Sequence, residues 1–188
     1  MSKAVIEVKG LHKIYEGAVP VKAVNGIDLV ISEGEFTALK GPSGCGKTTL
    51  LNLLGGLDQP NSGSIIIDGT DITGLSDNEL IDFRLHHIGF VFQAYNLIPV
   101  LSATENVSFI MLLQNRSKDE RLERANQLLK AVGLAGKEEK RPGQLSGGQQ
   151  QRVAVARALA SKPKFVLADE PTANLDSEST SKLLEIML

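Results

Sequence analysis

The sequence predicts an α/β protein with a mostly parallel sheet and a helical segment inserted into it. Three observations support this class. Short apolar runs alternate with helix-forming segments over residues 1–93, a glycine-rich loop joins one such run to a helix at residues 41–49, and helical spacing prevails over residues 94–160. We therefore expect a single domain over residues 1–188, with a core of residues 1–93 and 161–188 and a helical subdomain of residues 94–160.

Composition narrows the class of protein further. The net charge is −2, whereas a general nucleic-acid binder is expected to carry a basic surplus. No run approaches the ~20 apolar residues of a membrane span, and the N-terminus lacks the hydrophobic segment of a signal peptide. Because Cys45 is the single cysteine, no internal disulfide can form. We expect a cytoplasmic protein that does not bind nucleic acid.

Residues 41–49, Gly-Pro-Ser-Gly-Cys-Gly-Lys-Thr-Thr, match the phosphate-binding pattern G-x-x-x-x-G-K-(S/T) at every fixed position. The apolar run 36–39 before them predicts a buried strand, and residues 48–54 predict a helix. Glycines let several N–H groups surround one anion at the positive end of a helix. Lys47 would add charge for the outer phosphates and Thr48 a hydroxyl for Mg²⁺. A nucleotide site is favoured over a chance glycine-rich turn.

The segments before this loop predict two strands, at residues 5–8 and 27–31, separated by a segment that includes residues 12–17. Tyr15 lies in that segment, in an expected loop. An aromatic ring upstream of a phosphate loop could stack on a base, or it could simply pack with its hydroxyl anchored. Position alone leaves both interpretations open.

The segments after the first helix continue the sheet. Turn residues at 55–63 precede a strand at 64–69 that ends in an Asp-Gly turn. Ser76 and Glu79 have capping-box spacing before a helix at 79–85, and residues 87–93 predict a buried strand. That strand places Gln93 at its carboxyl end, the edge where ligands bind in parallel sheets. A solvated glutamine is the alternative.

Helix starts mark the inserted segment. Ser102 and Ser117 each precede a glutamate by three residues, which is the spacing of a capping box. One apolar stripe then follows at Leu122, Ala125, Leu128, Leu129 and Val132.

Another helix begins at Ser146, with an apolar face formed by Val153, Ala156, Leu159 and Ala160. Ser146 and Gln149 form a capping box in the purely structural interpretation. Gly147 and Gly148 weaken the helix start by about 1 kcal/mol each relative to Ala. They make sense if backbone N–H groups must approach a ligand, so this helix start is a second candidate anion site.

A short apolar strand at residues 165–168 is followed by Asp169 and Glu170. Adjacent carboxylates after a buried strand are costly unless a cation or a proton needs them. With a phosphate loop upstream, one acid can hold Mg²⁺ while the next polarises the attacking water. An ordinary loop start is the alternative. Asp176 then caps a last helix that ends at Leu188.

Residues 145–149, Leu-Ser-Gly-Gly-Gln, precede the acidic pair at Asp169 and Glu170 in a chain that also has the phosphate loop. With this combination, the whole chain resembles the nucleotide-binding subunits of ABC transporters. Residues 56–60, 90–97 and 168–176 are most similar to the lipoprotein-release, macrolide-export and cell-division branch. The resemblance implies a P-loop NTPase core with an N-terminal antiparallel β subdomain and an inserted α-helical subdomain. It also implies ATP and Mg²⁺ as ligands.

The resemblance also implies a role for each candidate residue. Tyr15 would stack on adenine, and the phosphates would be surrounded by Ser43, Gly44, Cys45, Gly46, Lys47, Thr48 and Thr49. Ser146, Gly148, Gln149 and Asp176 would lie at the dimer interface, the first three at the nucleotide of a second copy. Thr48, Gln93 and Asp169 would lie at the metal, and Glu170, Lys47 and Gln93 would be catalytic.

The implied partners are a second copy of the chain, which forms a head-to-tail dimer around ATP, and an integral-membrane permease that holds the subunit at the inner face of the membrane. The implied function is ATP hydrolysis that drives export or extraction of a lipophilic or peptide-like substrate. One alternative is a nucleotide-gated regulatory module that acts on a membrane partner without transport, as in the cell-division relatives. Another is a soluble ABC protein of DNA repair or translation, which a compact helical segment without a coiled-coil insertion disfavours.

Family members carry a switch histidine beyond the segment at Asp176. His12, His86 and His87 all precede that position, so none of them matches it. We therefore expect this 188-residue sequence to bind ATP and to hydrolyse it weakly.

Overall fold

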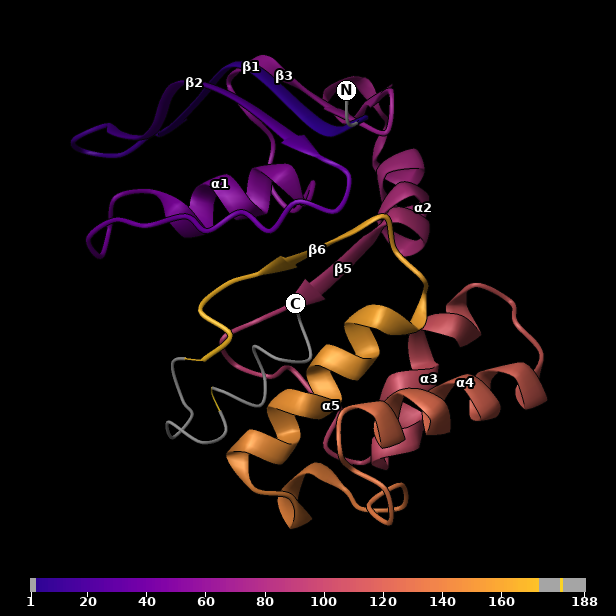
Figure 1. Ribbon diagram of the computed structural model, residues 1–188. Helices are drawn as coiled ribbons and strands as arrows, with labels where there is room; N and C mark the ends of the chain where they lie inside the picture. Colours follow the sequence, from indigo (N-terminus) through magenta and orange to yellow (C-terminus); the bar gives the residue numbers. More distant parts are fainter. Residues whose placement is uncertain (1–2, 173–179, 181–188) are drawn as a thin grey trace. The chain divides into compact units, whose positions relative to one another are not determined.

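The structure, a computed structural model, describes residues 3–172 and residue 180 (Figure 1). It divides into two compact units, Met1–Arg84 and Leu85–Leu188. The predicted last helix, with Asp176 at its start, lies almost entirely outside the described residues. Among the described residues, no helix combines the length and the apolar character needed to span a bilayer.

An antiparallel sheet forms most of the first unit. Its strands are β1 (Ala4–Tyr15), β2 (Val21–Ser32), β3 (Ser62–Ile67) and β4 (Thr70–Asp71), in the order β2-β1-β3-β4. Asp68 and Gly69 join β3 to β4 with φ angles of 45° and 84°. A tight hairpin turn needs positive φ at both central residues, so the predicted Asp-Gly turn is confirmed.

Strand β1 is longer than the sequence indicated. Its register against β2 shifts between Val8 and Leu11, where Gly10 has a φ of 53° and donates its N–H to Asp28 Oδ1 at 2.7 Å. Such a bulge lets a strand continue past an irregular residue. The loop expected at residues 12–17 was therefore wrong in part, because β1 runs on to Tyr15.

Helix α1 (Lys47–Leu54) lies along one face of this sheet (Figure 1) and buries Leu50, Leu53 and Leu54. It confirms the helix predicted after the glycine-rich loop. The strand predicted at residues 36–39 was wrong, because these residues form no strand and Phe36 is 57% exposed. An apolar run favours a strand, but a strand also needs a neighbouring strand to hydrogen-bond with, and these residues join neither sheet in the described part of the chain.

A short 3₁₀ turn (Ile72–Gly74) and helix α2 (Asp77–His87) follow the sheet. Ser76 donates its N–H and its hydroxyl to Glu79 Oε2 at 2.9 and 2.6 Å. This pairing confirms the predicted helix start, and α2 is two residues longer at each end than the predicted range 79–85.

The second unit contains a parallel strand pair, β5 (Ile88–Val91) and β6 (Phe165–Ala168), in a register that sets Val91 opposite Ala168. Strand β5 is shorter than the predicted range 87–93, so Gln93 lies two residues beyond its end. Helix α5 (Gly147–Ala160) packs on the pair so closely that a Cβ at Gly89 would lie 2.5 Å from the carbonyl oxygen of Ala158.

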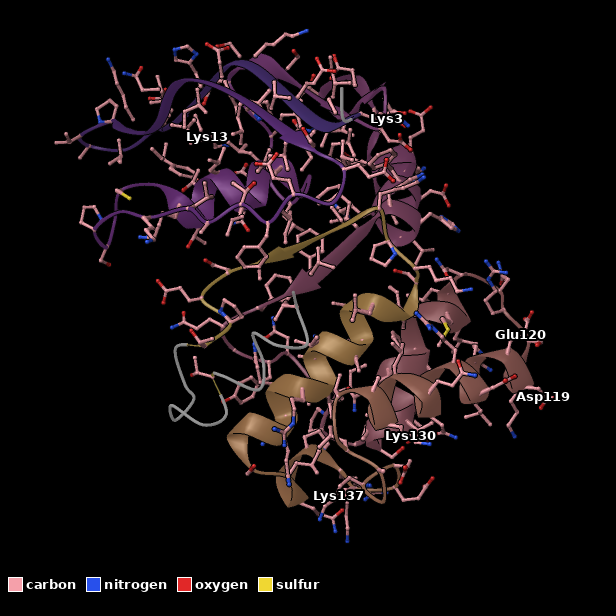
Figure 2. The ribbon with its side chains drawn as sticks, viewed as in Figure 1. Lys3, Lys13, Asp119, Glu120, Lys130 and Lys137 are labelled. Atoms are coloured by element: carbon pink, nitrogen blue, oxygen red, sulfur yellow. The ribbon has the colours of Figure 1, made fainter. Side chains whose placement is uncertain are left out.

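Helices α3 (Ala103–Leu113), α4 (Lys118–Ala131) and α5 pack together around a hydrophobic core. A 3₁₀ turn (Pro142–Gln144) precedes α5. Both predicted capping boxes are present, at Ser102 with Glu105 and at Ser117 with Glu120. Figure 2 labels Glu120 in the first turn of α4. The core confirms most of the predicted stripes; its buried members are Ala103, Val107, Met111, Ala125, Leu128, Leu129, Val132, Leu134, Leu145, Val153, Ala156 and Ala160. The assignment of residues 94–160 to an inserted subdomain stays a prediction.

Candidate functional site

The loop before α1 has the backbone that an anion cradle requires. Gly44 and Gly46 have φ angles of 78° and 96°, in the left-handed region that favours glycine. Gly46 is also the N-cap of α1 and gives it no side-chain hydrogen bond, and the first turn holds no acidic residue. The positive end of the helix dipole therefore meets no negative side chain of its own first turn, which suits an external anion.

Lys47, the first residue of α1, points back into this loop. Its ammonium donates to the carbonyl oxygens of Gly41 and Pro42, both at 2.9 Å, and lies 3.9 Å from Cys45 Sγ. The side chain thus places a positive charge inside the loop. Ser43, Cys45 and Thr48 are exposed, and Thr49 is half-buried.

Strand β2 brings Tyr15 to the same region as the phosphate loop. A Cβ at Gly46 would lie 2.1 Å from the carbonyl oxygen of Ala23, so the loop rests directly on β2. In the β1–β2 register, Ile14 pairs with Lys22 and Tyr15 with Val21. Tyr15 is therefore paired two residues along β2 from the contact with the loop, and its ring is 43% exposed.

The Tyr15 hydroxyl is anchored by a hydrogen bond, as expected if Tyr15 has a packing role. It donates to Asp58 Oδ2 at 2.8 Å, while Lys13 Nζ donates to Asp58 Oδ1 at 2.6 Å and lies 5.0 Å from the centre of the Tyr15 ring. Partial burial opposes ionisation of Asp58, but hydrogen bonds from Lys13, Tyr15 and the Gln59 N–H outweigh it and hold its pKa below the ordinary value. Anchoring of the hydroxyl leaves much of the ring exposed, so a base-stacking role stays a prediction.

The second unit brings Gln93, Asp169 and Glu170 to one edge. Strands β5 and β6 are parallel, and Asp169 continues their ladder by donating its N–H to the Val91 carbonyl at 3.0 Å. Gln93 and Glu170 are exposed and Asp169 is half-buried. Glu170 has a φ of 44°, a strained backbone for a residue with a side chain.

Arg157 of α5 holds the segment that follows Gln93. Its guanidinium donates to the carbonyl oxygens of Tyr95 at 2.8 Å and Asn96 at 2.5 Å, and burial lowers its pKa. Arg157 could not be identified from the sequence, because a single arginine on an amphipathic helix carries no signal of its partner. Lys13 and Asp58 could not be identified either, because no local pattern links residues 45 positions apart.

The capping box predicted at the start of α5 is present. Ser146 Oγ accepts from the Gln149 N–H at 3.3 Å, and Gln149 Oε1 accepts from the Ser146 N–H at 3.0 Å. Ser146 is exposed, and Gly147 and Gly148 form the first turn. Both polar side chains therefore have a local role, and contact with a nucleotide is not needed to explain them.

The comparison with protein families decides the identity. The family model described as ABC transporter matches residues 24–173. The chain belongs to the ABC transporter family. That range includes the glycine-rich loop, Gln93, the Ser146 helix start and both carboxylates.

Curated ABC relatives agree with the branch that the sequence resembles. The lipoprotein-releasing system ATP-binding protein LolD 1 of Rhodopseudomonas palustris is 48% identical over 97% of this chain and 82% of its own. The macrolide export ATP-binding/permease protein MacB of Escherichia coli is 47% identical over 98% of this chain. The chain spans only 29% of that fused relative's length. These matches confirm the resemblance to the lipoprotein-release and macrolide-export proteins.

A solved ABC structure confirms the fold class. The ATP-binding cassette MJ0796, in a dimeric post-hydrolysis state bound to ADP and Pi, matches with a TM-score of 0.89 and 45% identity over 96% of this chain and 80% of its own. The α/β fold with an antiparallel N-terminal sheet and inserted helices is therefore that of an ABC cassette.

The residues divide between the two units. Tyr15 and the loop residues 43–49 lie in the first, whereas Gln93, Ser146, Gly148, Gln149, Asp169 and Glu170 lie in the second. In the second unit, Gln93 and Asp169 carry oxygen donors of the kind that suits Mg²⁺, which takes few protein ligands and keeps waters and phosphate oxygens around it. Thr48 carries such a donor in the first unit. Among the described residues, no group of three or more His, Cys, Asp or Glu side chains could hold a metal by itself.

Proposed function

We propose that this ABC protein binds Mg²⁺–ATP, hydrolyses it and uses the cycle to drive a membrane permease in export or extraction of a lipophilic or peptide-like substrate. The observation that carries the proposal is the loop at Gly41–Lys47. Its left-handed glycines, the uncapped start of α1 and the inward Lys47 ammonium together form a site for a polyphosphate.

In this proposal, the first unit binds ATP at both ends, the phosphates and the adenine. Ser43, Gly44, Cys45, Gly46, Lys47, Thr48 and Thr49 surround the phosphates, and Tyr15 stacks on adenine. The register of β1 on β2, which brings Tyr15 near the loop, supports a single ligand that contacts both. Stacking on a π-face tolerates different bases, so Tyr15 would add affinity without selecting one base strictly.

The second unit supplies the groups for hydrolysis. Asp169 and Gln93 hold Mg²⁺ with Thr48, and Glu170 polarises the attacking water. Their position at the carboxyl edge of parallel strands is the place where α/β proteins act on ligands. The left-handed backbone of Glu170, with a φ of 44°, supports a functional role, because such strain is concentrated at functional sites.

A second copy completes the site in this proposal. Ser146, Gly148 and Gln149 of one copy contact the nucleotide bound by the other, and Asp176 lies at the interface. The dimeric state of the MJ0796 cassette supports this assembly. Bound ATP then holds the halves together, and loss of the γ-phosphate lets them part.

The names of two relatives support a permease partner and a cargo that is exported or extracted. MacB is by its name an ATP-binding and permease protein for macrolide export, and LolD 1 is part of a lipoprotein-releasing system. We therefore place the chain at the inner face of the membrane, bound to an integral-membrane permease, with a substrate of lipophilic or peptide-like chemistry.

Calorimetric titration with Mg²⁺–ATP, followed by sedimentation with and without nucleotide, tests the proposal. We expect wild type to bind ATP, Lys47→Met to lose binding, and Glu170→Gln to bind ATP but release no phosphate. Dimers should form with ATP and not with ADP. ATP binding unaffected by Lys47→Met, or phosphate release unaffected by Glu170→Gln, would contradict the corresponding assignment.

A further inference from the structure

Three side chains in the first unit form a cluster that the phosphate loop does not explain. Lys13 and Tyr15 are two residues apart on β1, so both project from the same side of the strand (Figure 2 shows Lys13). Asp58 lies in the turn after α1 and accepts from both of them, at 2.6 Å from Lys13 and 2.8 Å from Tyr15. Lys13 also donates to the Gln59 carbonyl at 2.7 Å.

The cluster fixes the Tyr15 ring from its tip and from one face. The hydroxyl is held by Asp58, and the Lys13 ammonium lies 5.0 Å from the ring centre, within range of a cation–π contact. The Lys13 side chain is only 13% exposed, whereas Tyr15 is 43% exposed. The ammonium is therefore largely buried beside the ring, while Tyr15 keeps exposed surface that a ligand could contact.

Asp58 is tied in turn to the helix that begins at the phosphate loop. The Leu57 N–H donates to the Asn52 carbonyl at 2.8 Å, and the Asp58 N–H approaches the same oxygen at 3.4 Å. Asn52 belongs to α1, whose first residue is Lys47. One short helix thus presents an anion site at its start and, in the turn after its end, a carboxylate that holds the ring.

We propose that Asp58 and Lys13 are positioning residues for the adenine ring of ATP: they hold Tyr15 in the orientation that stacks on the base. This proposal rests on the proposed function, because it assigns Tyr15 to adenine. Pre-ordering a side chain lowers the entropic cost of binding, so the cluster should raise affinity for ligands that carry a base and leave affinity for bare polyphosphate unchanged.

Titration with two probes, Mg²⁺–ATP and inorganic tripolyphosphate, tests the proposal. Tyr15→Ala should weaken ATP binding about tenfold, as loss of one base-stacking ring does. Asp58→Asn and Tyr15→Phe should each weaken ATP binding about threefold, the scale of ordering one side chain. None of the three should change binding of tripolyphosphate. Asp71→Asn, which removes a hydrogen-bonded carboxylate from another turn of the same unit, is the matched control and should change neither.

A double variant separates positioning from general damage to the fold. In the Tyr15→Ala background, Asp58→Asn should have no further effect on ATP, because no ring remains to be held. An equal loss of ATP and tripolyphosphate in Asp58→Asn, or a loss of ATP that persists without the ring, would overturn the proposal. Wild type that binds tripolyphosphate but shows no preference for ATP would also overturn it, whereas failure to bind either probe would overturn the proposed function as well.

Discussion

Gly46 and Ala23 are in such close contact that residue 46 has no room for a side chain. A Cβ there would lie 2.1 Å from the Ala23 carbonyl oxygen, and the φ of Gly46 is 96°. The glycine that the phosphate-binding pattern demands is thus required twice, once by backbone conformation and once by the strand beneath it. Tyr15 pairs with Val21, two residues from Ala23 along β2.

Gly46→Ala should therefore lower the free energy of unfolding by about 2–4 kcal/mol, the sum of an overpacked contact and a left-handed alanine. Gly34→Ala is a matched control, because Gly34 has a φ of 75° but nothing within 4 Å of the added Cβ. It should cost only about 1 kcal/mol. Urea denaturation of both variants measures the difference. Equal costs at the two positions would mean that the loop does not rest on Ala23 in solution.

Cys45 reports on occupancy of the loop. Its thiol is free and exposed, and Lys47 Nζ lies 3.9 Å from it. We expect N-ethylmaleimide to label Cys45 and block ATP binding, and Mg²⁺–ATP to protect it. At a concentration of ten times its Kd, ATP should slow labelling about tenfold by mass action. Lys47→Met should abolish the protection, and labelling that ignores ATP in wild type would argue against binding at this loop.

The sequence predicted best those features that depend on local chemistry. The helix after Gly46, the three serine capping boxes and the Asp-Gly turn each rest on contacts within four residues, and all are present. Long-range pairing was predicted less well. Residues 36–39 are apolar but form no strand, and β1 continues to Tyr15 through a bulge at Gly10, which no periodicity reveals.

The candidate site divides in the same way. The motif residues could be found from spacing, but their supports could not. Asp58 reaches Tyr15 across 43 residues of chain, and Arg157 reaches Tyr95 across 62. One sequence contains no signal that links such distant positions, so these supporting side chains emerged only from the structure.

Asp58 should also make stability depend on pH. Its pKa is lower in the folded protein, so the stabilisation that it contributes is present above the ordinary carboxylate pKa and is lost as the pH falls through the folded value. Asp58→Asn should cost about 1–2 kcal/mol at neutral pH, since it removes hydrogen bonds to a charged group. The difference between wild type and variant should shrink below about pH 4. Chemical denaturation at several pH values measures it, and a difference that grew on acidification would contradict this sign.

Two buried amides predict opposite results for the same substitution. Asn106 is 1% exposed and donates to the carbonyl oxygens of Ile98, Leu101 and Ser102, whereas Gln151 is 1% exposed and its amide has no hydrogen-bond partner among the described residues. Asn106→Leu should cost about 3 kcal/mol or more, because it removes the acceptor of the Ile98 N–H and the donor to the Leu101 carbonyl oxygen. Gln151→Leu should be neutral or stabilise by about 1 kcal/mol. A large loss of stability in Gln151→Leu would show that its amide is satisfied in solution.

Ser146, Ser117 and Ser102 offer a matched series that separates capping from nucleotide recognition. In each, the hydroxyl oxygen accepts from a backbone N–H three residues on, at 3.3, 3.3 and 3.2 Å. Replacing any of the three by alanine should therefore cost about 1 kcal/mol of stability. Ser117 is the closer match to Ser146, because both are exposed.

Only Ser146→Ala should also weaken the dimer that forms with ATP, because only Ser146 is assigned to the nucleotide of a second copy. Sedimentation of Glu170→Gln in the three alanine backgrounds, with Mg²⁺–ATP present, gives the dimer dissociation constant for each. We expect about a tenfold rise for Ser146→Ala, the effect of losing one hydrogen bond to a charged group, and no change for the other two. Equal dimerisation in all three would reduce Ser146 to a helix cap, and its neighbours Gly147 and Gly148 would then carry any contact through their N–H groups alone.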